Sequence, residues 1–324
     1  MRISWFILLA APLLAQSPQQ FHELKDLRLE SGQTLPACRI GYRTFGTLNA
    51  DRSNAVLFPT WFSGKSEDLA AFIGPAQLVD TSRYFAVAVD ALSNGVSCGA
   101  GVGNVTIGDM VRSQHRLITE KFGVKKLHAV IGISMGGMQT FEWITAFPAF
   151  MRKAVPIIGS PKLTSADLLL WQAELSAIEA VRAAGGAPRT AMPAVLAMHQ
   201  FALTTPADHV GKTAPEQFPA LRAKLENDAK TGMAPLDWAA QLRAMMAQDV
   251  ARNYGGSMEK AGAAVQAQVL VVVATQDHMV NPTPALQMAE KSGFSVLRLT
   301  GNCGHMATSC ESAKLISAVS AFLQ

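Results

Sequence analysis

The chain has 324 residues, of which 49% are hydrophobic and 16% charged, and its formal net charge is +4. This apolar content, without internal repeats, excludes a disordered chain, a coiled coil and a collagen-like fibre. Because the basic residues form no run, nothing indicates a nucleic-acid partner, and we expect a globular protein with one main domain.

The first residues have the composition of a secretory signal peptide. Arg2 supplies one positive charge, an apolar run extends from Trp5 to Leu14, and a polar segment follows Ala15. The run is too short for a stable membrane span, and no other segment approaches about 18 uninterrupted apolar residues. We therefore expect a signal peptide over residues 1–15, no stable membrane span, and an exported protein, periplasmic or secreted. The alternative is a buried N-terminal helix.

Four cysteines would meet an oxidising compartment after export: Cys38, Cys98, Cys303 and Cys310. Four cysteines allow three pairings, and the short spacing favours a bond between Cys303 and Cys310. Four free and mostly buried thiols are the alternative, since a chain of this size needs no covalent cross-links. No cysteine pattern has the spacing of a zinc site, so we expect no metal.

Short β-branched runs alternate with amphipathic stretches, which is typical of βαβ units around a mostly parallel sheet with helices on both faces. The run Val269 to Ala274 is apolar without alternation, as expected for a central strand. The expected strands are 39–45, 55–58, 84–89, 128–133, 153–158, 269–274 and 295–299. The expected helices are 109–121, 137–146, 284–291 and 309–322.

The middle of the chain differs from both ends. It is rich in Ala, Leu and Met at helical spacing and contains no convincing strand. We therefore divide the chain into an α/β core of residues 16–160 and 265–324 and a helical lid insertion over residues 161–264. Insertions of this kind often cover a binding site, and we also expect that the lid provides the contact for a homodimer.

A nucleophile motif follows the strand expected at 128–133. Gly132-Ile133-Ser134-Met135-Gly136 matches G-x-S-x-G and stands directly before an expected helix, which is the strand-turn-helix context that the motif requires. A turn this sharp strains the serine backbone and crowds its neighbours, so glycine is needed on both sides. Ser134 is therefore the candidate nucleophile.

A serine hydroxyl needs a histidine that removes its proton and an acid that orients the histidine, in the chain order Ser, Asp or Glu, His. Asp277 follows the strand expected at 269–274, and His305 follows the last expected strand. Parallel α/β sheets gather their sites at the carboxyl ends of strands. We therefore predict a triad of Ser134, Asp277 and His305. A turn residue and a structural loop histidine are the alternatives for the last two.

An oxyanion formed at Ser134 would need backbone N–H donors. The arrangement typical of such sites uses the residue after the nucleophile, here Met135, and one residue of the loop after an early strand. In the loop at 59–64 we expect Phe62 to be that donor, with Trp61 as the second choice. Alternatively, this hydrophobic loop only packs against the lid.

Several motifs resemble the homoserine O-acetyltransferase family. They are Gly-Tyr-Arg-Thr-Phe-Gly-Thr-Leu-Asn at 41–49, Asp-Thr-Ser-Arg-Tyr-Phe at 80–85, Asp-Met-Val-Arg-Ser-Gln at 109–114 and, most specifically, Ser-Met-Gly-Gly-Met-Gln at 134–139. The resemblance implies an α/β-hydrolase fold with a helical lid. It also implies a ping-pong reaction in which Ser134 takes an acyl group from an acyl-CoA co-substrate and passes it to a hydroxyl acceptor.

Some positions depart from the family pattern and bear on the acceptor. Leu175 stands where the family usually has an arginine that grips the acceptor's carboxylate, and Met306 replaces the usual acid after the histidine. A buried carboxylate without a cation is strongly disfavoured, so homoserine is not the expected acceptor. Trp61 and Leu175 are instead expected to bind an apolar substrate, unless Arg182 or Arg189 replaces the missing cation.

Three functions remain open from the sequence. The first is an acyltransferase with a small-molecule acyl donor and an altered hydroxyl acceptor. The second is an exported carboxyl-ester hydrolase in which water takes the acceptor's place at the same triad. The third is a secreted binding protein without activity, which an intact Ser, Asp and His set disfavours. No bound cofactor is expected in any of them.

Overall fold

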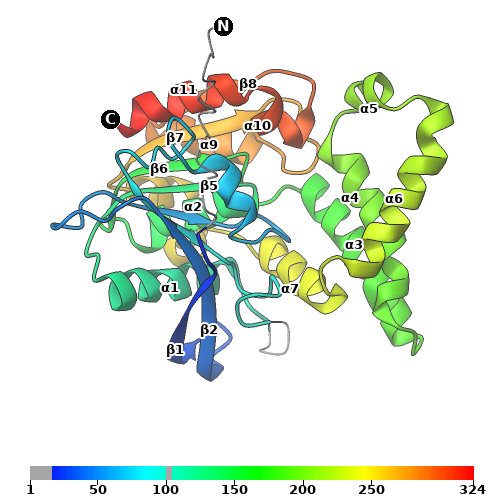
Figure 1. Cartoon of the computed structure of the whole chain (residues 1–324), viewed down its shortest axis with the longest axis horizontal. Coiled ribbons are helices and arrows are strands. Elements are labelled where there is room, and N and C mark those ends of the chain that lie inside the picture. The colour runs from blue at the N-terminus through cyan, green and yellow to red at the C-terminus, as the bar shows by residue number, and fades with distance from the viewer. Residues whose placement is uncertain (1–16, 100–103) are drawn as a thin grey trace, which may run out of the picture.

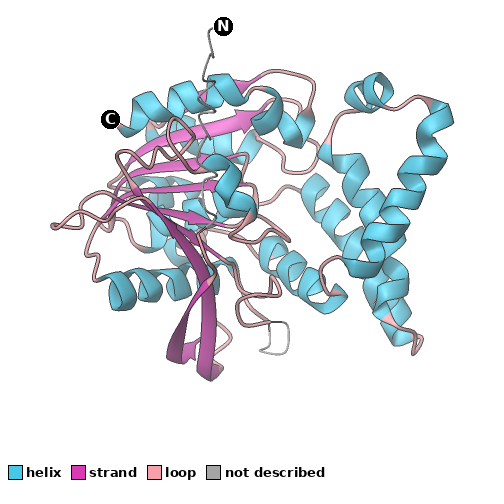
Figure 2. Ribbon diagram, in the orientation of Figure 1, coloured by secondary structure: helices cyan, strands magenta, loops and turns pink. Residues whose placement is uncertain are grey.

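The computed structural model describes residues 17–99 and 104–324, so the signal peptide expected over residues 1–15 lies outside the described residues. Eight strands form one sheet in the order β1-β2-β4-β3-β5-β6-β7-β8. β1 pairs antiparallel with β2, and β2 with β4, whereas the other neighbours are parallel (Figures 1 and 2). The strands are β1 (Gln20–Arg28), β2 (Thr34–Phe45), β3 (Ala55–Pro59), β4 (Phe85–Val89), β5 (Leu127–Ile133), β6 (Met151–Ile157), β7 (Gln268–Ala274) and β8 (Ser295–Leu299).

Each strand expected from the sequence is present, and β1 is an addition that the sequence pattern did not predict. In β1 only Leu24 and Leu27 are buried, and the residues around them are largely polar. An edge strand with so few buried residues shows no clear alternation of apolar and polar positions. The long antiparallel pair β1–β2 projects from the sheet in Figure 1.

The central strands are buried on both faces, as the unbroken apolar run of β7 indicates. Val271 and Val273 belong to the hydrophobic core that includes helices α1, α2 and α9, whereas Val272 belongs to a second core that includes α11. The helices outside the lid are α1 (Ile107–Arg116), α2 (Met135–Ala146), α9 (Thr283–Ser292), α10 (Ala307–Cys310) and α11 (Ser312–Leu323). The stretch expected as one helix over 109–121 is α1 followed by a π-helical turn, Leu117–Lys121.

The segment between β6 and β7 consists of helices and the loops that join them, and the only β-type pairing among its described residues is an isolated bridge between Lys162 and Asp249. Its helices are α3 (Ser165–Ala183), α4 (Met192–Leu203), α5 (Pro206–Lys212), α6 (Phe218–Thr231), α7 (Pro235–Met246) and α8 (Met258–Ala263). Helices α3 to α6 stand beside the sheet, on the side to which the parallel strands point (Figure 2). In contrast, α8 contacts α9 of the sheet domain.

Two disulfides join the four cysteines. Cys303 bonds to Cys310 with Cα atoms 6.5 Å apart, which confirms the pairing that the sequence spacing favours. Cys38 of β2 bonds to Cys98 in the loop after β4, with Cα atoms 5.6 Å apart. No helix in the described ranges combines the length and the apolarity needed to cross a membrane. The described His, Cys, Asp and Glu side chains form no group of three that could hold a metal ion.

Candidate active site

Ser134 occupies the sharp turn between β5 and α2. Its backbone has φ 58° and ψ −120°, a conformation that costs energy for a residue with a side chain. A Cβ atom on Gly132 would lie 2.0 Å from the carbonyl oxygen of Gly136, and one on Gly136 would lie 2.6 Å from that of Pro59. Only glycine fits at both positions, so these residues permit the turn that presents the serine at the carboxyl end of the sheet.

The structure brings Ser134, His305 and Asp277 together in one hydrogen-bonded row. The Oγ atom of Ser134 lies 2.8 Å from Nε2 of His305, and Nδ1 of His305 lies 2.7 Å from Oδ2 of Asp277. The backbone N–H groups of Met279 and Val280 both donate to Oδ1 of Asp277 at 2.9 Å. These two bonds fix the carboxylate, so its second oxygen points at the histidine ring.

The hydrogen-bond partners also determine which ring nitrogen of His305 carries the hydrogen. Because a carboxylate only accepts, Nδ1 of His305 carries the hydrogen, and Nε2 of the neutral ring is left as an acceptor for the Ser134 hydroxyl. All three residues are largely buried, with 8%, 6% and 5% of their surface exposed for Ser134, Asp277 and His305. The arrangement can move a proton from the serine to the histidine within a site that excludes most water.

The loop after β3 passes over the start of α2. No hydrogen bond within the described residues uses the backbone N–H of Phe62, Trp61 or Met135. The side chains of Trp61 and Phe62 line the same cavity as Ser134, and Met135 is the first residue of α2. Within the described residues these N–H groups are therefore not used by other hydrogen bonds, as donors to an oxyanion on Ser134 would require.

Two buried glutamines hold this loop, and neither was singled out from the sequence. Gln139 of α2 donates to the carbonyl of Thr60 at 3.0 Å. From the lid, Oε1 of Gln241 on α7 accepts the N–H of Ser63 at 2.9 Å, and Nε2 of Gln241 donates to the carbonyl of Leu92 at 3.0 Å. The loop is thus fixed between α2 and the lid.

A cavity of about 550 Å³ opens above Ser134 and is mostly apolar. The described residues that line it include no lysine or arginine. The sheet domain contributes Trp61, Phe62, Ser63, Asp68, Phe72, Ile133, Ser134, Ile158, Met279, His305, Met306, Thr308 and Ser309. The lid contributes Trp171, Leu196, His199, Leu203 and Trp238.

Three residues considered from the sequence do not line this cavity. Leu175 is buried in the hydrophobic core, one helical turn after Trp171. Arg182 is exposed, and Arg189 donates to the carbonyls of Ala229, Gly232 and Met233 near the end of α6. On α3, Trp171 therefore reaches the cavity, whereas Leu175 belongs to the hydrophobic core.

The family model of the alpha/beta hydrolase fold matches residues 56–308. The chain belongs to this family. It is also 30% identical to an ethyl acetate hydrolase of Pseudomonas veronii, over 91% of this chain and 92% of that protein. A homoserine O-acetyltransferase of Geotalea daltonii is 36% identical, but over only 42% of this chain and 44% of that protein. Among solved structures, the acetyl esterase MekB has a TM-score of 0.86 and 27% identity, covering 95% of this chain and 96% of that one.

These relatives agree with the fold and the resemblance inferred from the sequence. An α/β hydrolase whose relatives are esterases and O-acyltransferases is an acyltransferase or an ester hydrolase. Apart from Gln139 of α2, the polar residues that sequence reasoning missed in this α/β hydrolase lie in the lid, namely Gln241 and the pair Glu174 and His199. Residues of this kind carry no local motif, because their partners are distant in the sequence.

Proposed function

We propose that the protein is a serine esterase that hydrolyses carboxylic esters with short acyl groups through an acyl-enzyme on Ser134. The observation that carries the proposal is the row Ser134, His305, Asp277 beneath an apolar cavity. Short acyl groups are supported by the relatives that align over nearly the whole chain, which are named for the hydrolysis of ethyl acetate and of acetyl esters.

In the first half of the proposed reaction, Oγ of Ser134 bonds to the ester carbonyl carbon while Nε2 of His305 takes the hydroxyl proton. The resulting oxyanion is stabilised by the N–H groups of Met135 and Phe62. When the bond to the alcohol oxygen breaks, His305 returns the proton to that oxygen and the alcohol leaves. Asp277 holds the ring and stabilises its charged form.

In the second half, water attacks the acyl carbon and gives its proton to His305, and the acid leaves as Ser134 regains its hydrogen. An apolar cavity without lysine or arginine favours neutral esters over substrates with a carboxylate, because burying an unpaired anion costs several kcal/mol.

Acyl transfer is the second candidate. It is supported by the identity to a homoserine O-acetyltransferase and by the motif at 134–139, and it would use the same triad with an acyl-CoA donor and a neutral alcohol acceptor. A competition separates the two functions. The acylated enzyme is offered homoserine and a neutral alcohol of similar size in water, and the products are quantified. Free acid as the main product supports hydrolysis, and an ester of homoserine would restore the ordinary function of the transferase family.

The nucleophile is tested by treating the active protein with a fluorophosphonate and locating the adduct by mass spectrometry. We expect the adduct on Ser134. We also expect the untreated protein to hydrolyse p-nitrophenyl acetate and Ser134→Ala to abolish this activity. An adduct at another residue of an active preparation would reject the assignment of the nucleophile. A soluble, folded protein that hydrolyses no short ester would reject the esterase proposal.

We also propose that the protein is exported after cleavage behind Ala15. The carbonyl of Ser17 accepts a hydrogen bond from the side chain of Arg43, its hydroxyl oxygen accepts the N–H of Thr44 at 3.3 Å, and Nε2 of Gln19 donates to Asp90 at 2.9 Å. A chain that begins at Gln16 would therefore start directly before residues attached to the core. Two disulfides fit an oxidising compartment. N-terminal sequencing of the native protein tests the proposal, and a retained Met1 would contradict it. The homodimer through the lid stays a prediction.

A further inference from the structure

A second acid and histidine pair borders the cavity above Ser134. Glu174 lies on α3 and His199 on α4, with Oε1 of Glu174 3.2 Å from Nδ1 of His199. The other oxygen of Glu174 accepts the Nε1–H of Trp238 at 3.0 Å. Glu174 is fully buried, whereas His199 lines the cavity and keeps 15% of its side chain exposed. The proposed triad uses neither residue.

The partners of Glu174 determine which nitrogen of His199 carries the hydrogen. The indole of Trp238 only donates and a carboxylate only accepts, so each oxygen of Glu174 receives an N–H. Nδ1 of His199 is therefore the protonated nitrogen. In the neutral ring, Nε2 is then a hydrogen-bond acceptor, and no hydrogen bond within the described residues reaches it.

Aromatic side chains fix the ring of His199 in this position. The ring centroids of Phe62, Trp171 and Trp238 lie 5.5, 6.2 and 5.1 Å from that of His199. These three side chains also line the cavity, so the Nε2 acceptor borders a largely apolar space. A wholly apolar substrate would leave this acceptor without a partner, whereas a hydroxyl group could donate to it.

We propose that His199, positioned by Glu174, is a specificity-determining residue that accepts a hydrogen bond from a free hydroxyl group on the alcohol part of the ester. The inference rests on the proposed esterase function. The hydroxyl group is assigned to the alcohol part of the ester because an acetyl group carries none. The preferred substrates are therefore short-chain monoesters of diols and related polyhydric alcohols. A substrate that only accepts hydrogen bonds gains nothing from Nε2.

The test uses three acetates whose alcohol chains have four heavy atoms: butyl acetate, 3-hydroxypropyl acetate and 2-methoxyethyl acetate. The value of kcat/KM is measured for each with the wild type and with His199→Phe. We expect the ratio of the hydroxypropyl to the butyl ester to fall about tenfold in the variant, the scale of one neutral hydrogen bond. The ratio of the methoxyethyl to the butyl ester should not fall. Ratios within one variant remove any general change in turnover.

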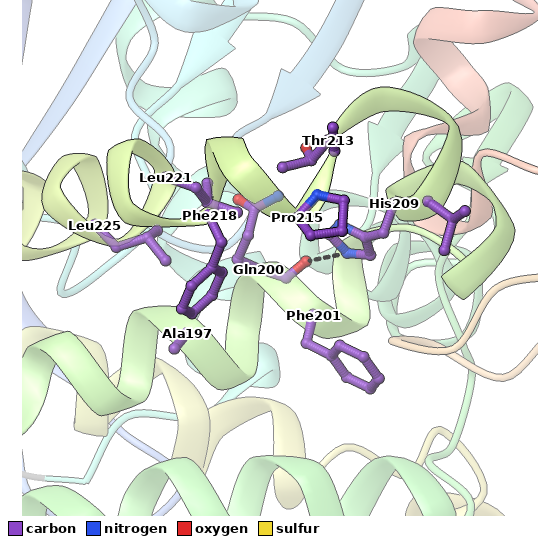
Figure 3. Close-up of a pocket in the computed structure, with 11 residues that line it drawn as sticks. Ala197, Gln200, Phe201, His209, Thr213, Pro215, Phe218, Leu221 and Leu225 are labelled. Carbon is purple, nitrogen blue, oxygen red and sulfur yellow. Dashed lines mark hydrogen bonds between the residues drawn. The ribbon is translucent and has the colours of Figure 1, made fainter.

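A matched control uses another lid histidine outside the cavity. His209 of α5 faces the backbone carbonyl of Gln200 at 3.2 Å and lines a separate apolar pocket of the lid (Figure 3). His209→Phe should leave both ratios as in the wild type. If His199→Phe also leaves the hydroxypropyl ratio unchanged, the proposal is overturned.

Glu174→Gln is a second variant, and a merely structural role of Glu174 would not produce its expected effect. In this variant the amide oxygen at position 174 accepts the Nε1–H of Trp238, and the amide N–H donates to Nδ1 of His199. Because Nδ1 must then accept, the ring hydrogen moves to Nε2. The variant should therefore gain several-fold in the ratio of methoxyethyl to butyl acetate, because Nε2 now donates to an ether oxygen. No gain in a folded variant would reject the positioning role of Glu174. Hydrolysis of butyl acetate by the wild type checks the esterase function separately.

Discussion

Gln241 of the lid accepts a hydrogen bond from the backbone N–H of Ser63, and the same side chain donates to the carbonyl of Leu92. Ser63 directly follows Phe62, whose N–H is the proposed oxyanion donor. Gln241 has no exposed surface, so neither bond competes with water. The lid therefore helps to hold the loop that supports catalysis in the sheet domain, in addition to lining the cavity.

Replacing Gln241 by Met should lower kcat more than it raises KM. The substitution keeps the size of the side chain but leaves the N–H of Ser63 and the carbonyl of Leu92 without partners, which destabilises the fold by about 1–3 kcal/mol. A displaced oxyanion donor should reduce kcat by roughly ten- to a hundredfold. Steady-state kinetics and a thermal melt measure both effects. A lower Tm with an unchanged kcat would show that Gln241 only stabilises the fold.

His305→Ala should reduce kcat by about 10⁵ to 10⁶, and Asp277→Asn by about 10⁴, since the histidine moves the proton and the acid orients it. The Asn side chain can keep its oxygen on the N–H groups of Met279 and Val280. It then presents an amide N–H to Nδ1 of His305, which places the ring hydrogen on the wrong nitrogen. Small and equal losses in the two variants would indicate that another base acts on Ser134.

Much of the fold could be predicted because its signals are local. The unbroken apolar run of β7 and the glycines around Ser134 reflect burial and backbone geometry at those positions. The proposed triad was also accessible, since each member lies in the segment that follows the carboxyl end of a strand, and parallel strands end at one edge of the sheet.

The contacts that the lid makes, both to the sheet domain and within itself, were not accessible in this way. Gln241 and Ser63 are 178 residues apart, and Glu174 and His199 lie on different helices, 25 residues apart. Such pairings depend on how the lid helices pack, and a helical pattern gives the helices but not their packing. For the same reason, sequence reasoning predicted Leu175 as a substrate-binding residue, whereas Trp171 is the α3 residue that reaches the cavity.

Stability should fall as the pH decreases below about 6.5, in part because of His115. Its ring stacks on Phe147 with centroids 4.1 Å apart and lies near Phe150, and burial lowers the pKa of His115 from the ordinary 6.5. Below pH 6.5 the unfolded chain binds the proton first, so stability is lost as the pH falls toward the pKa of the folded state.

His115→Phe keeps an aromatic ring on Phe147 and removes this titration. The decrease in Tm between pH 7 and pH 5 should therefore be smaller in the variant than in the wild type. Some decrease should persist, because burial also lowers the pKa of His128. Thermal melts across this pH range provide the measurement. An equal or steeper decrease in the variant would contradict the role of His115.

The two disulfides should differ in what they support. The bond between Cys38 and Cys98 closes a sequence separation of 60 residues, whereas that between Cys303 and Cys310 closes only 7. Loop entropy assigns about 4 kcal/mol of stability to the first bond and about 2 kcal/mol to the second. The shorter loop, however, contains His305 and the cavity residues Thr308 and Ser309.

The double variant Cys38→Ala with Cys98→Ala should therefore lower Tm more and kcat less than Cys303→Ala with Cys310→Ala. In the second variant, a less constrained His305 should reduce kcat by roughly tenfold, since a small displacement of a proton-transferring group strongly slows the reaction. Each double variant replaces two cysteines by alanine, so the two variants are matched in the number and size of their substitutions. Thermal melts and turnover of p-nitrophenyl acetate are measured side by side. If removal of Cys303 and Cys310 lowers Tm more while leaving kcat intact, the short disulfide supports the fold and not the position of the histidine.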